Sequence, residues 1–195
     1  MQITYNSPVI LTFALLCTGV TAANMSAVGS ITESLFSVTP YMDWFNPISY
    51  LRLFSHIVGH ADWDHLFGNM TILLLLGPMI EEKYGSRTLL IMMLITAFIT
   101  GLLNIALFQT GLMGASGVVF MLVLLSSLTN FKAGHLPLTF LLVVAIFLGN
   151  EIINALSNDQ ISQFAHVMGG ICGSIFGFKH QIEPSFLNLD NNENK

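Results

Sequence analysis

The feature that most constrains this chain is a series of six apolar runs separated by polar segments. A helix that crosses the hydrocarbon core of a bilayer needs about 20 predominantly apolar residues. Inside lipid, backbone polar groups must pair within their own segment, so runs of this length must be helical. We therefore predict an all-α membrane protein with six transmembrane helices. The predicted spans are residues 8–27, 65–81, 87–108, 116–130, 136–153 and 162–179.

The composition favours the same class of protein. Hydrophobic residues make up 53% of the 195 residues and charged residues only 9%, and the mean hydropathy is +0.71. A soluble domain carries about a quarter charged residues, so this surface has too few charges for water alone. The six Lys and Arg residues are scattered, which excludes nucleic acid as a partner. The expected surroundings are a lipid bilayer. Cys17 and Cys172 lie in apolar runs, so we expect packing residues rather than a disulfide.

No stretch outside the six runs is long enough for a second domain. We expect one six-helix membrane domain, residues 1–180, and a polar cytoplasmic tail, residues 181–195. The first run has an alternative interpretation, because residues 8–20 and the small residues after them are similar to a signal-peptide core with its cleavage site. Residues 1–7 lack the Lys or Arg of such a signal, which favours a retained helix.

The basic residues predict the orientation of the chain. Cytoplasmic loops of membrane proteins carry an excess of Lys and Arg. If the N-terminus is inside, only Arg52 lies in an outer loop, so we expect both termini in the cytoplasm of a multi-pass protein of the inner (plasma) membrane. The cytoplasmic segments then contain Lys83, Arg87, Lys132, Lys179 and Lys195.

Two segments depart from a simple crossing. The first loop is rich in aromatic residues, which lie at headgroup level in membrane proteins, so we expect an interfacial first loop. The fourth span has 15 residues and would extend about 22 Å at 1.5 Å per residue, less than the ~30 Å hydrocarbon core. We expect a short, partly buried fourth helix that starts below the outer surface. The aromatic residues of the loop are Tyr41, Trp44, Phe45, Tyr50 and Trp63.

The start of the fourth span contains the first candidate catalytic residue, Ser116. It reads G-L-M-G-A-S-G over residues 111–117, and glycines such as Gly114 support close backbone approach. A helix N-terminus presents unpaired N–H groups and a partial positive charge, which suits a nucleophile and the oxyanion it creates. Alternatively, Ser116 simply caps the helix. Val118 excludes the G-x-S-x-G elbow of soluble hydrolases.

The sixth span contains the candidate partner, His166. Gly169, Gly173 and Gly177 recur every four residues and form a smooth face that allows another helix to approach closely. His166 lies on the same face. An ionisable residue inside a membrane helix is costly and indicates function, so we expect His166 to take the proton of Ser116. The alternative is a buried histidine that donates to a carbonyl.

His65 and Asn69 form a third candidate group at the start of the second span. They are four residues apart and share a helix face. Both side chains donate hydrogen bonds, so together with the Ser116 N–H they suit an oxyanion hole. Alternatively, they are polar residues that meet headgroups and water at a helix end.

A metal site is the competing interpretation of the same region. His56 and His60 precede His65, and Asp62 and Asp64 are also residues of ligand type. The helical zinc signature H-E-x-x-H is missing from the sequence. We therefore expect no metal and no cofactor.

These motifs, taken in order, resemble the rhomboid intramembrane serine proteases over residues 52 to about 179. The resemblance implies six helices, a Ser–His dyad without a third acidic member, and cleavage of the membrane helices of other proteins. It implies that Ser116 is the nucleophile, His166 the base, and His65 and Asn69 the oxyanion donors.

The resemblance also implies structural roles and shows two departures. Arg52 matches a loop-anchoring arginine, and Glu81 an acidic residue that ties helices together on the inner side. Leu51 stands where many members have Trp, and Phe120 stands where many have a Tyr that stacks on the histidine. Phe120 keeps the aromatic face that can stack on the histidine and lacks only the hydroxyl of Tyr. The matching structural histidines are His56 and His60.

Two other functions compete with proteolysis. A catalytically silent relative that binds or escorts membrane proteins would lack the serine or the histidine, and both are present. A transporter often shows an internal repeat, and the two halves of this sequence show none. Unwinding a helix in lipid exposes backbone groups at several kcal/mol each. We therefore expect substrates to be membrane proteins whose transmembrane segments are weakened by Gly, Pro or polar residues.

Overall fold

The structure is a computed structural model that describes residues 3–26, 31–108, 110–129, 135–155 and 160–182. Most of the predicted tail, from residue 183 onward, lies outside the described residues. Every regular element in the described residues is a helix, and one isolated β-bridge joins two loop segments, so the all-α fold class is confirmed. The helices are α1 (Pro8–Ser26), α2 (Ile31–Leu35), α3 (Pro47–Ser55), α4 (Trp63–Tyr84), α5 (Ser86–Leu107), α6 (Ser116–Ser127), α7 (Leu138–Ala155) and α8 (Gln160–Ile182).

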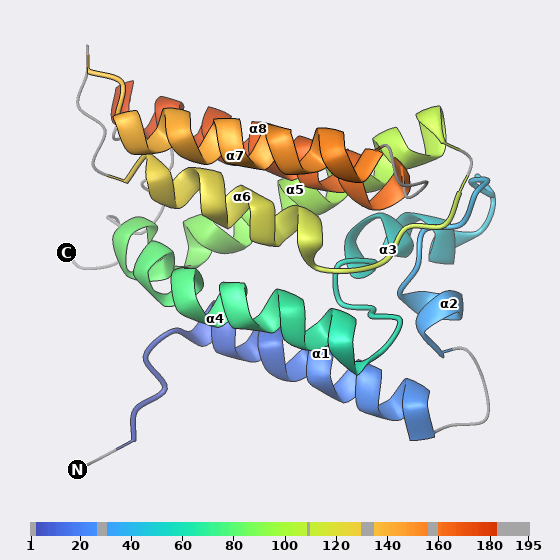
Figure 1. Cartoon of the computed structure of the whole chain (residues 1–195). Coiled ribbons are helices and arrows are strands. Elements are labelled where there is room, and N and C mark those ends of the chain that lie inside the picture. The colour runs from blue at the N-terminus through green and yellow to red at the C-terminus, as the bar shows by residue number, and fades with distance from the viewer. Residues whose placement is uncertain (1–2, 27–30, 109, 130–134, 156–159, 183–195) are drawn as a thin grey trace.

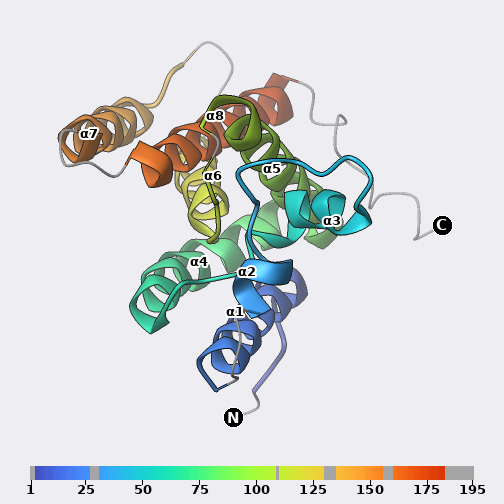
Figure 2. The same cartoon turned by 90° about the vertical axis from the view of Figure 1, so that its right-hand side faces the viewer.

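Each predicted span coincides with one of the longer helices, and successive long helices run in alternating directions (Figure 1). In the described residues, only α1 and α5 are both long and apolar enough to cross a membrane, and α6 and α7 are shorter apolar helices. The count of six crossings therefore stays a prediction. The short helices α2 and α3 lie at the end of the bundle where α4, α6 and α8 begin (Figure 1). Figure 2 shows α7 at the edge of the bundle, packed beside α8 and away from α4.

The helix boundaries differ from the predicted ones by a few residues, for identifiable reasons. α4 begins at Trp63, because the Asp62 carboxylate accepts a hydrogen bond from the His65 N–H (2.8 Å) and caps the helix. It ends at Tyr84, because the C-cap residue Gly85 has a φ of 82°, in the left-handed region that favours glycine. α6 has 12 residues, fewer than the predicted 15, and most of its side chains are buried.

α6 and α8 are in backbone contact through the glycine face of α8. A Cβ atom at Gly169 would overlap the carbonyl oxygen of Gly117, and one at Gly173 would overlap the carbonyl oxygen of Met121. Further along, a Cβ at Gly177 would lie 2.7 Å from Leu128 Cδ1. The absence of side chains on α8 therefore sets the distance between these two helices.

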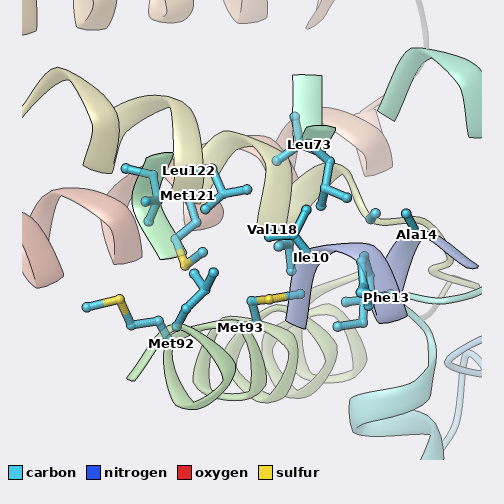
Figure 3. Packing of buried hydrophobic residues seen from close by; sticks show 14 of the residues in the cluster. Ile10, Phe13, Ala14, Leu73, Met92, Met93, Val118, Met121 and Leu122 are labelled. Atoms are coloured by element: carbon cyan, nitrogen blue, oxygen red, sulfur yellow. The ribbon is translucent and has the colours of Figure 1, made fainter. Parts of the chain in front are cut away.

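The main apolar core joins α1, α4, α5 and α6. Met92 and Met93 of α5 meet Met121 of α6 on one side of the core, and Ile10 of α1 and Leu73 of α4 lie on the other (Figure 3). All five side chains are at most 1% exposed. Flexible methionine side chains fill irregular gaps between helices, which suits a core where four helices meet.

A buried carboxylate ties three helices together at the end of the bundle away from α2 and α3. Glu81 of α4 accepts hydrogen bonds from the N–H groups of Val9 (2.9 Å) and Ile10 (3.0 Å) at the start of α1. The Ser86 hydroxyl, at the start of α5, donates to the same carboxylate (2.7 Å). Glu81 thus satisfies the N-terminal amides of α1 from a neighbouring helix.

The contact between α6 and α8 leads to a first prediction. Gly173→Ala adds a methyl group against the Met121 carbonyl, and overpacking of this kind costs about 1–3 kcal/mol. We expect a lower midpoint of thermal unfolding in detergent. In Gly19→Ala, the matched control in α1, the added methyl meets nothing within 4 Å. The control should be neutral or stabilising, because alanine favours a helix over glycine by about 1 kcal/mol. Equal midpoints for the two variants would contradict the contact.

Candidate active site

Ser116 is the first residue of α6, and the residue before it is the cap. Ala115 is the N-cap, with φ −77° and ψ −1°, and no side chain caps the helix. The alternative interpretation of Ser116 as a helix-capping residue is therefore wrong. The N–H groups of the first turn of a helix have no intrahelical acceptor, so they remain available beside Ser116.

The backbone before Ser116 turns sharply at Gly114 and approaches α4. Gly114 has φ +122°, a conformation that L side chains rarely adopt. A Cβ at this position would lie 2.8 Å from Cε1 and Nε2 of His65. Both the conformation and the space therefore require glycine, and the turn places the start of α6 directly over the His65 ring.

The first loop holds this segment by hydrogen bonds to its backbone groups. Val38 and Leu112 exchange two of them (2.9 and 3.1 Å), which is the isolated β-bridge of the structure. The Gly114 N–H donates to the His56 carbonyl (2.9 Å), and the Ala115 N–H donates to Nε2 of His60 (3.5 Å). The backbone N–H groups of Gly114 and Ala115 therefore both donate to the first loop.

The buried histidines of the first loop are held in one tautomer. Nδ1 of His60 lies 3.1 Å from the Val58 carbonyl, which can only accept, so Nδ1 carries the proton and Nε2 accepts from Ala115. Nδ1 of His56 likewise lies 3.1 Å from the Arg52 carbonyl. Burial lowers the pKa of each histidine to about 4. Both rings are therefore neutral at pH 7.

Arg52 anchors α3 to α2 and lies apart from the site. Its Nε and Nη2 atoms donate to the Ser34 carbonyl (3.0 and 2.5 Å), and the Ser55 hydroxyl donates to the Leu35 carbonyl (2.5 Å). These bonds fold the first loop onto itself. They shape the loop from which Val38, His56 and His60 bond the segment before Ser116.

His65 and Asn69 lie beside the turn that precedes Ser116. The His65 ring meets the His60 ring edge-on, with centroids 5.0 Å apart. The buried Asn69 amide donates to the His65 carbonyl (3.1 Å). A primary amide has two N–H bonds, so a second donor remains on Asn69. No group of three or more His, Cys, Asp or Glu residues that could hold a metal ion occurs among the described residues.

His166 lies over the face of α6 that begins with Ser116. The rings of His166 and Phe120 have centroids 4.2 Å apart, and Phe120 follows Ser116 by one helical turn. The residues next to the two candidates also meet, because a Cβ on Gly117 would lie 3.4 Å from the Ala165 carbonyl oxygen. The structure thus brings Ser116, His65, Asn69 and His166 to one end of the bundle.

The comparison with known families decides the identity of this fold. The Rhomboid domain matches residues 47–181, which is more than half of the chain. The chain belongs to the rhomboid family. The family resemblance inferred from the motifs is therefore confirmed, and the match includes α3 to α8 except the last residue of α8.

Two relatives show how the similarity is distributed. The rhomboid chain is 32% identical to Rhomboid protease GlpG of Haemophilus influenzae over 130 residues, which cover 65% of this chain and 68% of that protein. It is 31% identical to RHOMBOID-like protein 1 of Arabidopsis thaliana over 144 residues, which cover 69% of this chain and 36% of the plant protein. The chain thus spans only about a third of that plant relative.

The structure adds positioning residues of this rhomboid that the motifs did not indicate. Thr100 of α5 lies 3.4 Å from Nε2 of His56, and its methyl group lies against Gly117. Asn104 donates to the Thr110 carbonyl (2.7 Å) in the segment that leads to Ser116. The sequence did contain a pattern that could have indicated these residues. Thr96, Thr100 and Asn104 recur every four residues in an apolar run, which places three polar side chains on one helix face.

The pKa of His60 leads to a second prediction. Its folded-state pKa, about 4, lies below the ordinary value of 6.5, so the unfolded chain binds more protons between these pH values. The free energy of unfolding should therefore fall by roughly 1–3 kcal/mol as the pH drops from 6.5 to 4. His60→Gln offers a carbonyl acceptor to Ala115 that does not titrate, so it should remove the His60 share of this fall and make the profile shallower, while His56 keeps its own share.

The measurement is the free energy of unfolding in mixed micelles between pH 7 and 4. His135→Gln is the control, because His135 is exposed and lies after α6, away from the first loop. Its profile should match that of the wild type. A His60→Gln profile as steep as the wild-type profile would contradict the neutral, accepting His60.

Proposed function

We propose that this rhomboid is an intramembrane serine protease that cleaves the transmembrane segments of other membrane proteins. Ser116 is the nucleophile, His166 is its general base, and no cofactor takes part. The observation that carries the proposal is the seating of the His166 ring over Phe120, one turn after Ser116, where α6 and α8 are in backbone contact. A serine and a histidine from two helices in such contact can share a proton.

The reaction needs two proton transfers in each half. His166 takes the proton of the Ser116 hydroxyl as its oxygen attacks the scissile carbonyl carbon. The tetrahedral intermediate then breaks its C–N bond, and His166 gives the proton to the leaving amine. In the second half, His166 takes a proton from water, the resulting hydroxide attacks the acyl-serine, and Ser116 recovers its proton. The products are two peptides with a new carboxylate and a new amine.

The negative charge of the intermediate needs donors beside Ser116. The amides of Gly114 and Ala115 donate to the first loop, so the Ser116 N–H is the first amide of this stretch that remains for the oxyanion. We assign the other donors to the side chains of His65 and Asn69. Removing one such donor typically lowers the rate by ~10²–10³.

The proposal includes the location of the protein and the kind of substrate. We place it in the inner (plasma) membrane with both termini in the cytoplasm, because the basic residues lie mostly in the segments this orientation puts inside. Ser116 then faces the outer half of the bilayer. An extended peptide must reach it, so suitable substrates carry helix-weakening residues near the outer end of a transmembrane segment.

The third prediction tests the two catalytic residues. Ser116→Ala and His166→Ala should each abolish cleavage of a transmembrane substrate, because a dyad acts as a unit and loses nearly all activity when either member is removed. Ser127→Ala is the matched control, since its hydroxyl donates only to the Leu124 carbonyl of the same helix (2.7 Å). It should cleave at the wild-type rate, and EDTA should change nothing.

Labelling with a fluorophosphonate in detergent provides an independent readout. The reagent should label the wild type and the Ser127→Ala control but not Ser116→Ala. If Ser116→Ala or His166→Ala were to cleave at the wild-type rate, the dyad would be wrong. If a correctly folded wild type neither cleaved nor took the label, the chain would be a silent binding or escort protein.

The fourth prediction concerns the substrate. Replacing the Gly, Pro and polar residues in the outer third of a cleaved single-span protein with Leu should lower its cleavage sharply. The reason is that a stable helix keeps its carbonyls hydrogen-bonded and covered, whereas a weakened one opens at lower cost. The measurement is the cleavage rate and the site of the cut by mass spectrometry. Undiminished cleavage, or cuts near the cytoplasmic end, would contradict the proposed depth of Ser116.

A further inference from the structure

The end of the bundle opposite Ser116 contains a second group of polar side chains, which the proposed reaction does not use. α4 ends there with Lys83 and Tyr84, and the last turn of α8 contributes His180 (Figure 1). The rings of Tyr84 and His180 have centroids 4.5 Å apart, and Lys83 Nζ lies 5.7 Å from the centre of the Tyr84 ring. Three groups that donate hydrogen bonds therefore gather at one place.

Two of these groups are buried and make no hydrogen bond within the described chain. Tyr84 is 5% exposed and its hydroxyl has no partner there, and neither has Nδ1 of His180. A buried polar group without a partner costs about 1–3 kcal/mol. Two such groups in contact at a helix end are therefore a sign of a binding site rather than of packing.

The charges of the cluster indicate an anion as the ligand. Lys83 is the cation of the cluster, and its Nζ lies beside the Tyr84 ring, whose hydroxyl has no partner in the described chain. Lys83 has no ion-pair partner among the described residues. The buried carboxylate nearby, Glu81, accepts from the amides of α1 and the hydroxyl of Ser86 instead. The cluster therefore combines the positive charge of Lys83 with two buried polar groups that have no partner among the described residues.

A groove that begins at this cluster identifies the kind of anion. Lys83 lines a groove of about 220 Å³ between α4 and α6, and its α4 wall is formed by apolar side chains. Met79 in this wall is 67% exposed, on the outside of the helix bundle where lipid contacts a membrane protein. The remaining lining residues are Leu76, Ile80, Ser126 and Thr129.

We propose that this site binds an anionic phospholipid. Lys83, the Tyr84 hydroxyl and His180 donate to the phosphate oxygens, and one acyl chain lies along the groove between α4 and α6. The phosphate satisfies the two buried donors and balances the charge of Lys83, and the acyl chain covers the apolar wall. A free phosphate would bind the donors of the cluster but would leave the apolar wall of the groove uncovered. The proposal does not depend on the protease activity.

The experiment measures the thermal unfolding midpoint of the full chain in nanodiscs of phosphatidylglycerol or of phosphatidylcholine. Phosphatidylglycerol should raise the midpoint of the wild type by several degrees over phosphatidylcholine. Lys83→Gln and Tyr84→Phe should each lose at least half of this rise. Tyr84→Phe should also be neutral or stabilising in phosphatidylcholine, because it removes an unpaired buried hydroxyl.

Arg87→Gln is the matched control, because it removes one exposed positive charge at the same end of the bundle. It should keep the full rise. Equal midpoints of the wild type in the two lipids would overturn the proposal, and so would an Arg87→Gln loss as large as the Lys83→Gln loss. A third arm adds inorganic phosphate to phosphatidylcholine nanodiscs. It should leave the midpoint unchanged, and a rise equal to that with phosphatidylglycerol would overturn the assignment to a lipid.

Discussion

The backbone contact between α6 and α8 is the constraint on which the rest of the structure depends. Gly169 and Gly173 place no side chain between the helices, so their faces touch the carbonyls of Gly117 and Met121 directly. Lipid supplies no hydrophobic force between helices, so close packing of this kind is what holds membrane helices together. The helix that begins with Ser116 and the helix that contains His166 therefore cannot slide past each other without a clash.

A second consequence of the architecture is that the segment before Ser116 is held from outside the helix pair. Its hydrogen bonds go to Val38, to the His56 carbonyl and to His60, all in the first loop. That loop is folded by Arg52 and rests on α5 through Thr100. The helix pair thus sets how Ser116 and His166 lie relative to each other, and the first loop sets the course of the chain that leads to Ser116.

Much of the fold could be predicted, because its determinants are local. The apolar runs coincide with helices to within a few residues, and the four-residue spacing of the glycines in α8 indicated its packing face. The pairing of Val38 with Leu112 could not be predicted, because the two residues are 74 positions apart and bond only through their backbones. The resemblance indicated that Arg52 anchors a loop, but its partner could not be predicted, because the Ser34 group that it bonds is a backbone carbonyl without a sequence signal.

The hydrogen bonds of Glu81 link α4 to the first helix of the chain. The buried carboxylate belongs to α4, and its main partners, the amides of Val9 and Ile10, belong to a helix made before it. Removal of α1 by a signal peptidase would take away both of these hydrogen bonds and leave the carboxylate with the one from Ser86. The first helix lies outside the matched Rhomboid domain, residues 47–181. Its backbone amides at Val9 and Ile10 nevertheless join it to a carboxylate inside that domain.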